Sequence, residues 1–106
     1  MGAFIYMLRC SDGSLYVGIA TGSDLTRRIA EHNAGVHRGY TFVRRPVQLI
    51  WSEHFDVMTD AIAVERQIKG WSRAKKEALA NGEWIRVTTL AKRRAGRPLK
   101  KNSETD

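Results

Sequence analysis

The sequence has few of the residues that would support a disulfide-bonded, metal-clustered or membrane-bound protein. Cys10 is the single cysteine among 106 residues, which excludes an internal disulfide and indicates a reducing compartment, so we expect a cytoplasmic protein. The three histidines are spread too widely along the chain to form a zinc site with it. The apolar run from Ala3 to Leu8 is too short for a signal peptide or a membrane span, and we expect no membrane partner.

Acidic residues are also scarce relative to basic ones. The chain has 11 Asp and Glu against 18 Lys and Arg, a formal net charge of +7. Such an excess indicates a polyanionic partner, above all nucleic acid. An acidic membrane surface is the competing explanation, although the sequence contains no long amphipathic basic helix. The hydrophobic content of 42% and the length of 106 residues fit one globular domain with a single modest core.

The positive charge is concentrated at the C-terminal end. Residues 91–106 carry six basic and two acidic side chains and almost no apolar ones, so they cannot bury enough surface to fold alone. We therefore assign the folded domain to residues 1–90 and expect a disordered basic tail after it. Arg93, Arg94 and Arg97 belong to a short arginine-proline pattern that resembles a DNA minor-groove hook. The alternative, which we favour, is a generic basic tail that raises non-specific affinity for DNA.

Two segments near the N-terminus predict a β-hairpin. Residues 3–9 and 14–19 are rich in aromatic and β-branched residues, and a Ser-Asp-Gly turn separates them. A three-residue loop, with a type I turn followed by a left-handed Gly13, determines how the two strands pair. A two-residue loop would instead send the aromatic side chains of the two strands to opposite faces, so the prediction depends on the turn type.

With the three-residue loop, two tyrosines share one face of the hairpin. Tyr6 then lies opposite Gly18, and Tyr16 lies opposite Leu8. Because Gly18 has no side chain, we expect it to leave room beside Tyr6 for the backbone of a substrate. For either tyrosine alone, packing in the core is the more frequent explanation.

The rest of the chain alternates between helical and extended patterns. The first expected element is a helix capped by Ser23 or Asp24 and ended by Gly35, and a loop follows it to Pro46. A strand at 47–51 comes next. Two more helices follow, one capped by Thr59 or Asp60 that runs to Lys69 and one from Ser72 to Asn81. Residues 83–90 are either a short strand or an extended packing segment. This order predicts an α+β fold: a three-stranded, mostly antiparallel sheet flanked by about three helices, chiefly on one side.

Polar side chains fall on or beside the buried stripes of the first two helices. At about 100° per residue, His32 lies on the stripe of the first helix, Arg28 lies on its shoulder, and Arg27 points away. Glu65 lies beside the buried stripe of the second helix, where an unpaired carboxylate is costly. Taken singly, each of these residues is explained as readily by a salt bridge, a polar rim or a solvated face.

The loop after the first helix contains basic side chains around an aromatic one. Arg38, Tyr40, Arg44 and Arg45 together suit phosphate contact with base stacking, as single-stranded or distorted DNA requires. We count Lys69, at the end of the second helix, as a further nucleic-acid contact. An ordinary solvated loop is an equally frequent explanation for so short a basic stretch.

Several short segments occur in an order that is typical of one family. They are Phe4-Ile5-Tyr6, Tyr16-Val17-Gly18, Leu25 through Asn33, and Glu65 through Lys69. In this order they resemble the GIY-YIG nuclease family. The segments Tyr40 through Val47 and Lys69-Gly70-Trp71 are similar to the small stand-alone bacterial subfamily of these proteins, the UPF0213-like group.

The resemblance implies a compact nuclease fold and a metal-dependent endonuclease that hydrolyses phosphodiester bonds of DNA. It implies that Tyr6 and Tyr16 are active-site tyrosines, with Arg28 as the catalytic arginine. It also implies that His32 is the helix neighbour of this arginine and that Glu65 is the ligand of Mg²⁺ or Mn²⁺. Tyr6 is the candidate general base or orienter of the water, and Tyr16 more readily positions water or phosphate.

The expected substrate is single-stranded, branched or damaged DNA, as in DNA repair, because the chain has no separate domain to read a sequence. A single active site cuts one strand, and the oligomeric state is left open. A non-catalytic nucleic-acid-binding protein that retains the nuclease fold is the alternative. RNA as the substrate is a third possibility.

Overall fold

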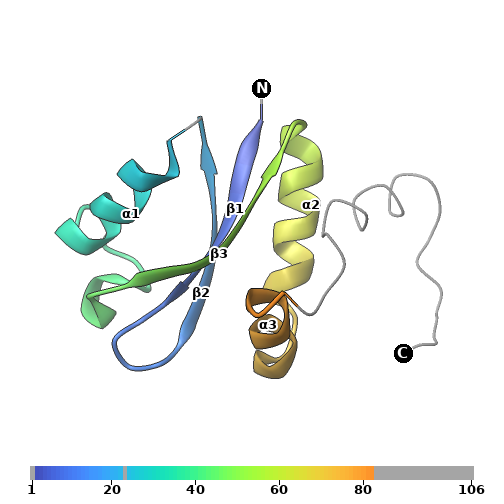
Figure 1. Ribbon diagram of the computed structural model, residues 1–106. Coiled ribbons are helices and arrows are strands. Elements are labelled where there is room, and N and C mark those ends of the chain that lie inside the picture. Colours follow the sequence, from blue (N-terminus) through green and yellow to red (C-terminus); the bar gives the residue numbers. More distant parts are fainter. Residues whose placement is uncertain (1, 23, 83–106) are drawn as a thin grey trace.

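The computed structural model describes residues 2–22 and 24–82 of the chain (Figure 1). Its elements are the strands β1 (Ala3–Arg9), β2 (Leu15–Thr21) and β3 (Gln48–Phe55), the helices α1 (Leu25–Ala34), α2 (Met58–Lys69) and α3 (Arg73–Ala80), and a short 3₁₀ turn, η1 (Phe42–Arg44), inside the segment expected to be a loop. The prediction of an α+β domain with one three-stranded sheet is confirmed. Within the described residues, no helix is both long enough and apolar enough to cross a membrane. The predictions for 83–90 and for the tail lie outside this part of the chain.

The N-terminal hairpin has the register predicted from its turn. Gly13 has a φ of +85°, as the left-handed position of a three-residue loop requires. Tyr6 consequently pairs with Gly18, and Leu8 pairs with Tyr16. β3 joins the other edge of β1, also antiparallel, so the strand order is β2-β1-β3.

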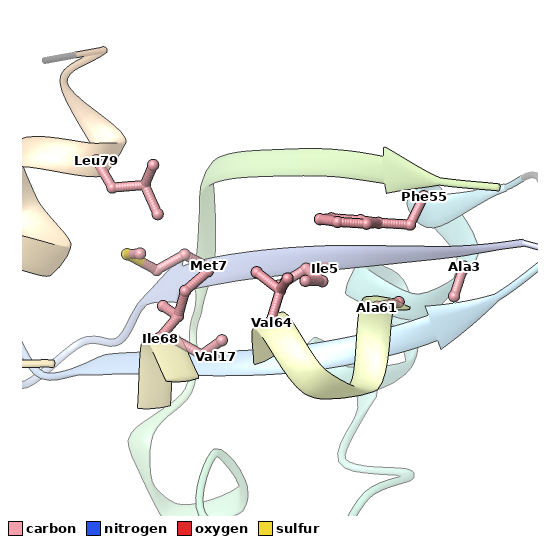
Figure 2. Packing of buried hydrophobic residues seen from close by; sticks show 9 residues of the cluster. All are labelled: Ala3, Ile5, Met7, Val17, Phe55, Ala61, Val64, Ile68 and Leu79. Carbon is pink, nitrogen blue, oxygen red and sulfur yellow. The ribbon is translucent and has the colours of Figure 1, made fainter. Parts of the chain in front are cut away.

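Helices cover both faces of the sheet, and two of the three lie on one face, as expected for cover chiefly on one side. α2 and α3 lie against one face and α1 lies against the other (Figure 1). The core on the α2 side consists of Ala3, Ile5, Met7, Val17, Phe55, Ala61, Val64, Ile68 and Leu79 (Figure 2). The core on the α1 side consists of Tyr6, Leu8, Cys10, Ala20 and Val47, with Leu25 and Ile29 packed against them. Since β1 is central and buried on both faces, its apolar run is continuous rather than alternating.

Three elements begin or end elsewhere than predicted, and one of them is β2, which spans Leu15–Thr21 rather than residues 14–19. β3 continues beyond Trp51 to Phe55, because Phe55 is buried in the core even though the residues just before it are mostly polar. The N-cap of α2 is Val57, which makes no side-chain cap hydrogen bond, so neither Thr59 nor Asp60 caps this helix. Asp60 instead lies in the first turn, where its negative charge interacts favourably with the helix dipole.

The other helix ends agree with the prediction. Asp24 caps α1 by accepting a hydrogen bond from the N–H of Thr26 at 3.1 Å, and Gly35 ends α1 with a φ of +81°. Ser72 caps α3 by accepting from the N–H of Lys75 at 3.2 Å. The caps determine where α1 begins and ends.

Candidate active site

A buried chain of three polar side chains connects the sheet, α1 and the loop after α1. The Tyr6 hydroxyl oxygen lies 2.8 Å from Nε2 of His32. The other ring nitrogen of His32, Nδ1, lies 2.8 Å from Oγ1 of Thr41. The exposed fractions are 1% for Tyr6, 3% for His32 and 1% for Thr41. Because buried polar groups must satisfy one another, these side chains hold each other in one orientation.

The ring of Tyr16 packs beside this chain. Its centroid lies 5.5 Å from that of His32 and 6.3 Å from that of Tyr6. Tyr40 stacks on Tyr16 with centroids 6.0 Å apart and an interplanar angle of 20°, and the guanidinium of Arg44 lies 3.9 Å from the centre of the Tyr40 ring. The prediction that the two hairpin tyrosines share a face is confirmed, and the basic loop contributes a third tyrosine to the same cluster.

Arg28 is the inward-facing arginine of α1. Its side chain is 32% exposed, whereas that of Arg27 is 81% exposed. Nε of Arg28 lies 3.8 Å from Glu31 Oε1, and this carboxylate also pairs with His37 at 3.1 Å. The shoulder position predicted for Arg28 therefore agrees with the structure, and Arg27 points into solvent.

Burial shifts the pKa of two members of the cluster. It raises the pKa of Tyr6 to about 12, and Tyr16 adds to the rise while Arg28 opposes it. Burial also lowers the pKa of His32 below its ordinary value of 6.5, and the nearby His37 and Arg28 lower this pKa further. At neutral pH, Tyr6 therefore keeps its proton and His32 is an uncharged ring. Tyr6 alone is a poor base, but His32 can accept its proton.

The lowered pKa of His32 makes stability depend on pH. Because the folded pKa lies below the unfolded value of 6.5, the unfolded state binds a proton that the native state resists. The stabilisation is fully present above the unfolded pKa and is lost as the pH falls below it, by up to about 1.4 kcal/mol per pH unit. We expect the free energy of unfolding, measured by urea titration, to decrease between about pH 7.5 and pH 5.5.

Acidic groups do not lower the free energy of unfolding between about pH 7.5 and pH 5.5. The pKa values of Asp12, Glu31 and Glu77 are lowered by their hydrogen bonds and ion pairs from ordinary values between 3.8 and 4.5, so their stabilisation is lost only at lower pH. A free energy of unfolding that stays constant between about pH 7.5 and pH 5.5 would contradict a neutral, buried His32.

The space beside Gly18 is filled by the two tyrosine rings. A Cβ at this position would lie 2.6 Å from Cζ and from the hydroxyl oxygen of Tyr6, and 2.9 Å from Cε2 of Tyr16. The room that we expected here for a substrate backbone is thus occupied by the protein itself. Gly18 is required because it lets both rings lie against the strand.

The contacts of Gly18 predict a large effect of one methyl group. Gly18→Ala should lower the free energy of unfolding by about 1–3 kcal/mol, because rigid rings rather than flexible chain ends must move. Gly39→Ala is the matched control, since no atom of the described residues lies within 4 Å of a Cβ there. Urea unfolding of both variants measures the difference. If Gly18→Ala stays within about 0.5 kcal/mol of the wild type, the rings are not held as the structure describes.

The arginines of the basic loop make contacts within the protein. Arg44 donates to Asp12 Oδ2 at 3.1 Å and to a backbone carbonyl of its own loop at 2.8 Å. Arg38 and Arg45 lie 4.3 and 4.5 Å from the centre of the Phe42 ring. The fold thus sets the positions of all three guanidinium groups, in the loop that borders the tyrosine cluster.

Glu65 lies on α2, which packs against the sheet from the face opposite α1 (Figure 1). The residue is 9% exposed, and its Oε2 lies 3.0 Å from Nζ of Lys69. The ion-pair alternative that the sequence left open is therefore realised, with a lysine as the partner. In the described part of the chain, no hydrogen bond or ion pair links Glu65 to the Tyr6–His32 pair.

Glu65 would supply one carboxylate ligand to a divalent cation. Among residues 2–22 and 24–82 no cluster of three or more His, Cys, Asp or Glu side chains is arranged to hold a metal ion. A single carboxylate still suits Mg²⁺ or Mn²⁺, because these ions keep several waters and take further ligands from substrate phosphates. The donor chemistry of Glu65 fits such an ion, with the substrate completing the site.

Three polar residues near the cluster were not placed there by sequence reasoning. Glu31 pairs with three groups: Arg27 at 3.2 Å, Arg28 at 3.8 Å and His37 at 3.1 Å. The ring of His37 lies 4.8 Å from that of His32. Thr41 completes the buried chain. His37 and Thr41 come from a loop, where periodicity gives no signal for side-chain direction.

The arginines predicted in the tail, Arg93, Arg94 and Arg97, lie outside the residues that the structure describes. The choice between a minor-groove hook and a generic basic tail therefore stays a prediction. The same holds for the domain boundary near residue 90.

Comparisons with known proteins agree on one family. A family model described as the GIY-YIG catalytic domain matches residues 2–78. The chain is 48% identical over 73 residues to a UPF0213 protein of Staphylococcus saprophyticus, which covers 69% of this chain and 87% of the relative. It is 47% identical over 77 residues to a UPF0213 protein of Haloquadratum walsbyi, which covers 73% of this chain and 84% of the relative.

Solved structures agree as well. The solution NMR structure of a UPF0213 protein from Bacillus halodurans is similar with a TM-score of 0.50 and 31% identity, over 92% of this chain and 100% of that one. The solution NMR structure of a protein from E. faecalis is similar with a TM-score of 0.53 and 34% identity, over 77% of this chain and 85% of that one.

Proposed function

The chain belongs to the GIY-YIG family of nuclease domains, and on this basis we propose that it is a metal-dependent endonuclease that hydrolyses phosphodiester bonds in DNA. The observation that carries the proposal is the buried hydrogen bond between Tyr6 and His32, with Arg28 beside it. A proton acceptor next to a permanent positive charge is what attack on a phosphodiester requires.

Arg28 stabilises the charge that develops in the reaction. Attack of water on phosphorus builds negative charge on the phosphate oxygens and on the leaving 3′ oxygen. The guanidinium of Arg28 is planar and always charged, so it can donate two hydrogen bonds to these oxygens. Its side chain is partly exposed and so can be reached by a substrate.

Tyr6 and His32 accept the proton of the attacking water together. Tyr16 is partly exposed and, with Arg28, makes the first contact with substrate, whereas Tyr6 and His32 lie behind them. Tyr6 passes its hydroxyl proton to Nε2 of His32 as it takes a proton from the substrate side. The raised pKa of Tyr6 suits this role, because the hydroxyl remains protonated before and after the transfer.

Glu65 is the residue that would hold the divalent ion, together with water and substrate phosphate oxygens. When bound, such an ion stabilises negative charge on the phosphate and on the leaving oxygen. Glu65 contributes the single protein carboxylate, and a bound ion would replace Lys69, whose Nζ lies 3.0 Å from Glu65 Oε2, as the partner of this carboxylate.

The surface near the cluster supports single-stranded, branched or damaged DNA as the substrate. Tyr40 is 43% exposed and Val43 is 79% exposed, and both lie in the loop that carries Arg38, Arg44 and Arg45. Exposed apolar and aromatic groups among arginines suit unpaired bases and their phosphates together. The family relationship supports DNA as the partner, and one such site cuts one strand.

The test is a cleavage assay on plasmid, single-stranded and branched DNA with Mg²⁺, Mn²⁺ or EDTA. We expect cleavage with a metal and none with EDTA, and a preference for single-stranded or branched substrates. If the protein binds these substrates tightly and cuts none of them with any metal, it is a non-catalytic nucleic-acid-binding protein that retains the fold. An RNA competitor shows whether DNA is the preferred ligand.

A further inference from the structure

The Thr41 hydroxyl contacts His32 rather than the backbone of its own turn. Thr41 is the N-cap residue of η1, with φ −80° and ψ −15°. Here the side chain makes no cap hydrogen bond. Its Oγ1 lies 2.8 Å from Nδ1 of His32 instead, and the residue is 1% exposed. The hydroxyl therefore acts on the histidine.

The contact with Thr41 bears on which nitrogen of His32 carries the proton. A neutral imidazole has one N–H and one unprotonated nitrogen. If Nδ1–H donates to Thr41, then Nε2 is unprotonated and accepts the hydrogen of Tyr6. If Thr41 donates to Nδ1, then Nε2–H points at Tyr6 and cannot take a proton from it.

Contacts of Tyr6 favour the first arrangement. Tyr6 keeps its hydroxyl hydrogen at neutral pH, and a buried hydroxyl needs an acceptor for it. Arg28, which lies close to this oxygen, only donates. An unprotonated imidazole nitrogen at 2.8 Å is a stronger acceptor than the hydroxyl of Tyr16.

We propose that Thr41 is a positioning residue of the active site: it accepts the Nδ1–H of His32 and so keeps Nε2 free to receive the proton of Tyr6. The inference rests on the proposed nuclease function for its role in turnover. In this arrangement the hydroxyl of Thr41 does not touch the substrate and acts through His32, as the partner of the second nitrogen does in other histidine sites.

The neighbouring residue strengthens the inference. Tyr40 stacks on Tyr16, so consecutive residues of one loop orient two rings of the cluster, one through stacking and one through a hydrogen bond. Thr41 is further anchored because its carbonyl accepts the N–H of Arg44 at 3.0 Å. A loop residue held by its backbone and buried at its side chain is well suited to orienting a histidine.

The test replaces Thr41 by a residue of the same shape without the hydroxyl. We expect Thr41→Val to lower turnover at saturating DNA on the order of tenfold, with KM unchanged, because one hydrogen bond to the proton acceptor is lost. Thr41→Ser should retain turnover. Thr59→Val, on the exposed surface of α2, is the control and should match the wild type.

A second readout does not depend on cleavage. The ¹⁵N chemical shifts of the His32 ring report which nitrogen is protonated, and we expect the Nδ1–H form in the wild type and in Thr41→Ser, and a mixture of forms in Thr41→Val. The inference is overturned if the wild type carries the proton on Nε2, or if Thr41→Val changes neither the ring signals nor turnover.

The two readouts separate the two proposals. A wild type that cuts no DNA but has the Nδ1–H form, with a mixture of forms in Thr41→Val, refutes the nuclease and leaves the orientation of His32 by Thr41 intact. If Thr41→Val does not fold, the ring signals of the wild type and of Thr41→Ser still decide which tautomer is present.

Discussion

Arg28→Ala should lower the rate of DNA cleavage by about 10²–10³-fold, the loss that follows removal of one preorganised donor to a developing oxyanion. The side chain of Arg28 is 32% exposed and acts on the pKa of Tyr6, so it lies beside the buried pair rather than in bulk solvent. The affinity for uncleaved DNA should change little, because Arg28 is only one of many basic groups on the chain. Single-turnover cleavage with bound metal, together with a binding titration in EDTA, separates these two effects.

Arg27→Ala is the matched control for this prediction. Arg27 has the same chemistry on the same turn of α1, but it is 81% exposed and pairs with Glu31 at 3.2 Å. Its loss should leave the cleavage rate within about twofold of the wild type, since exposed ion pairs contribute little. Arg28→Lys should not restore the rate, because an ammonium cannot donate in the planar fork. A larger loss for Arg27→Ala than for Arg28→Ala would refute the assignment.

The fold was predictable wherever a local rule decides the structure. The turn at Gly13 determines the register of the hairpin, and the register places Tyr6 and Tyr16 on one face. Caps likewise determine where α1 begins, at Asp24, and where it ends, at Gly35. The continuous apolar run of β1 indicates a strand buried on both faces, in agreement with the single helix, α1, that covers the second face.

The site was predictable only in the parts that lie on regular elements. Helical periodicity brings His32 and Arg28 to the correct side of α1, because the residues are one turn apart. Thr41 and His37 reach His32 from a loop, whose path depends on tertiary contacts such as the one between Arg44 and Asp12. No pattern within the sequence specifies such a path. Residues of this kind are found only once the chain is folded.

Glu65→Gln should lower metal-dependent cleavage by at least about 10²-fold, since a bound ion contributes several kcal/mol and each 1.36 kcal/mol is tenfold in rate. The substitution keeps the size of a side chain that is only 11% exposed and removes the charge that attracts a cation. The cleavage rate is measured as a function of Mg²⁺ and of Mn²⁺ concentration. Circular dichroism and urea unfolding check that the variant remains folded.

Lys69→Gln is the control that distinguishes a metal ligand from a structural ion pair. Nζ of Lys69 lies 3.0 Å from Oε2 of Glu65, so the lysine and a divalent ion compete for the same carboxylate. If Glu65 holds the ion, Lys69→Gln should keep the maximal cleavage rate and reach it at no higher metal concentration. Glu65→Gln should instead have a lower maximal rate and need a higher metal concentration. If the pair only stabilises α2, the two variants should behave alike, with small losses of stability and full cleavage. Equal behaviour of the two variants would therefore remove Glu65 from the metal site.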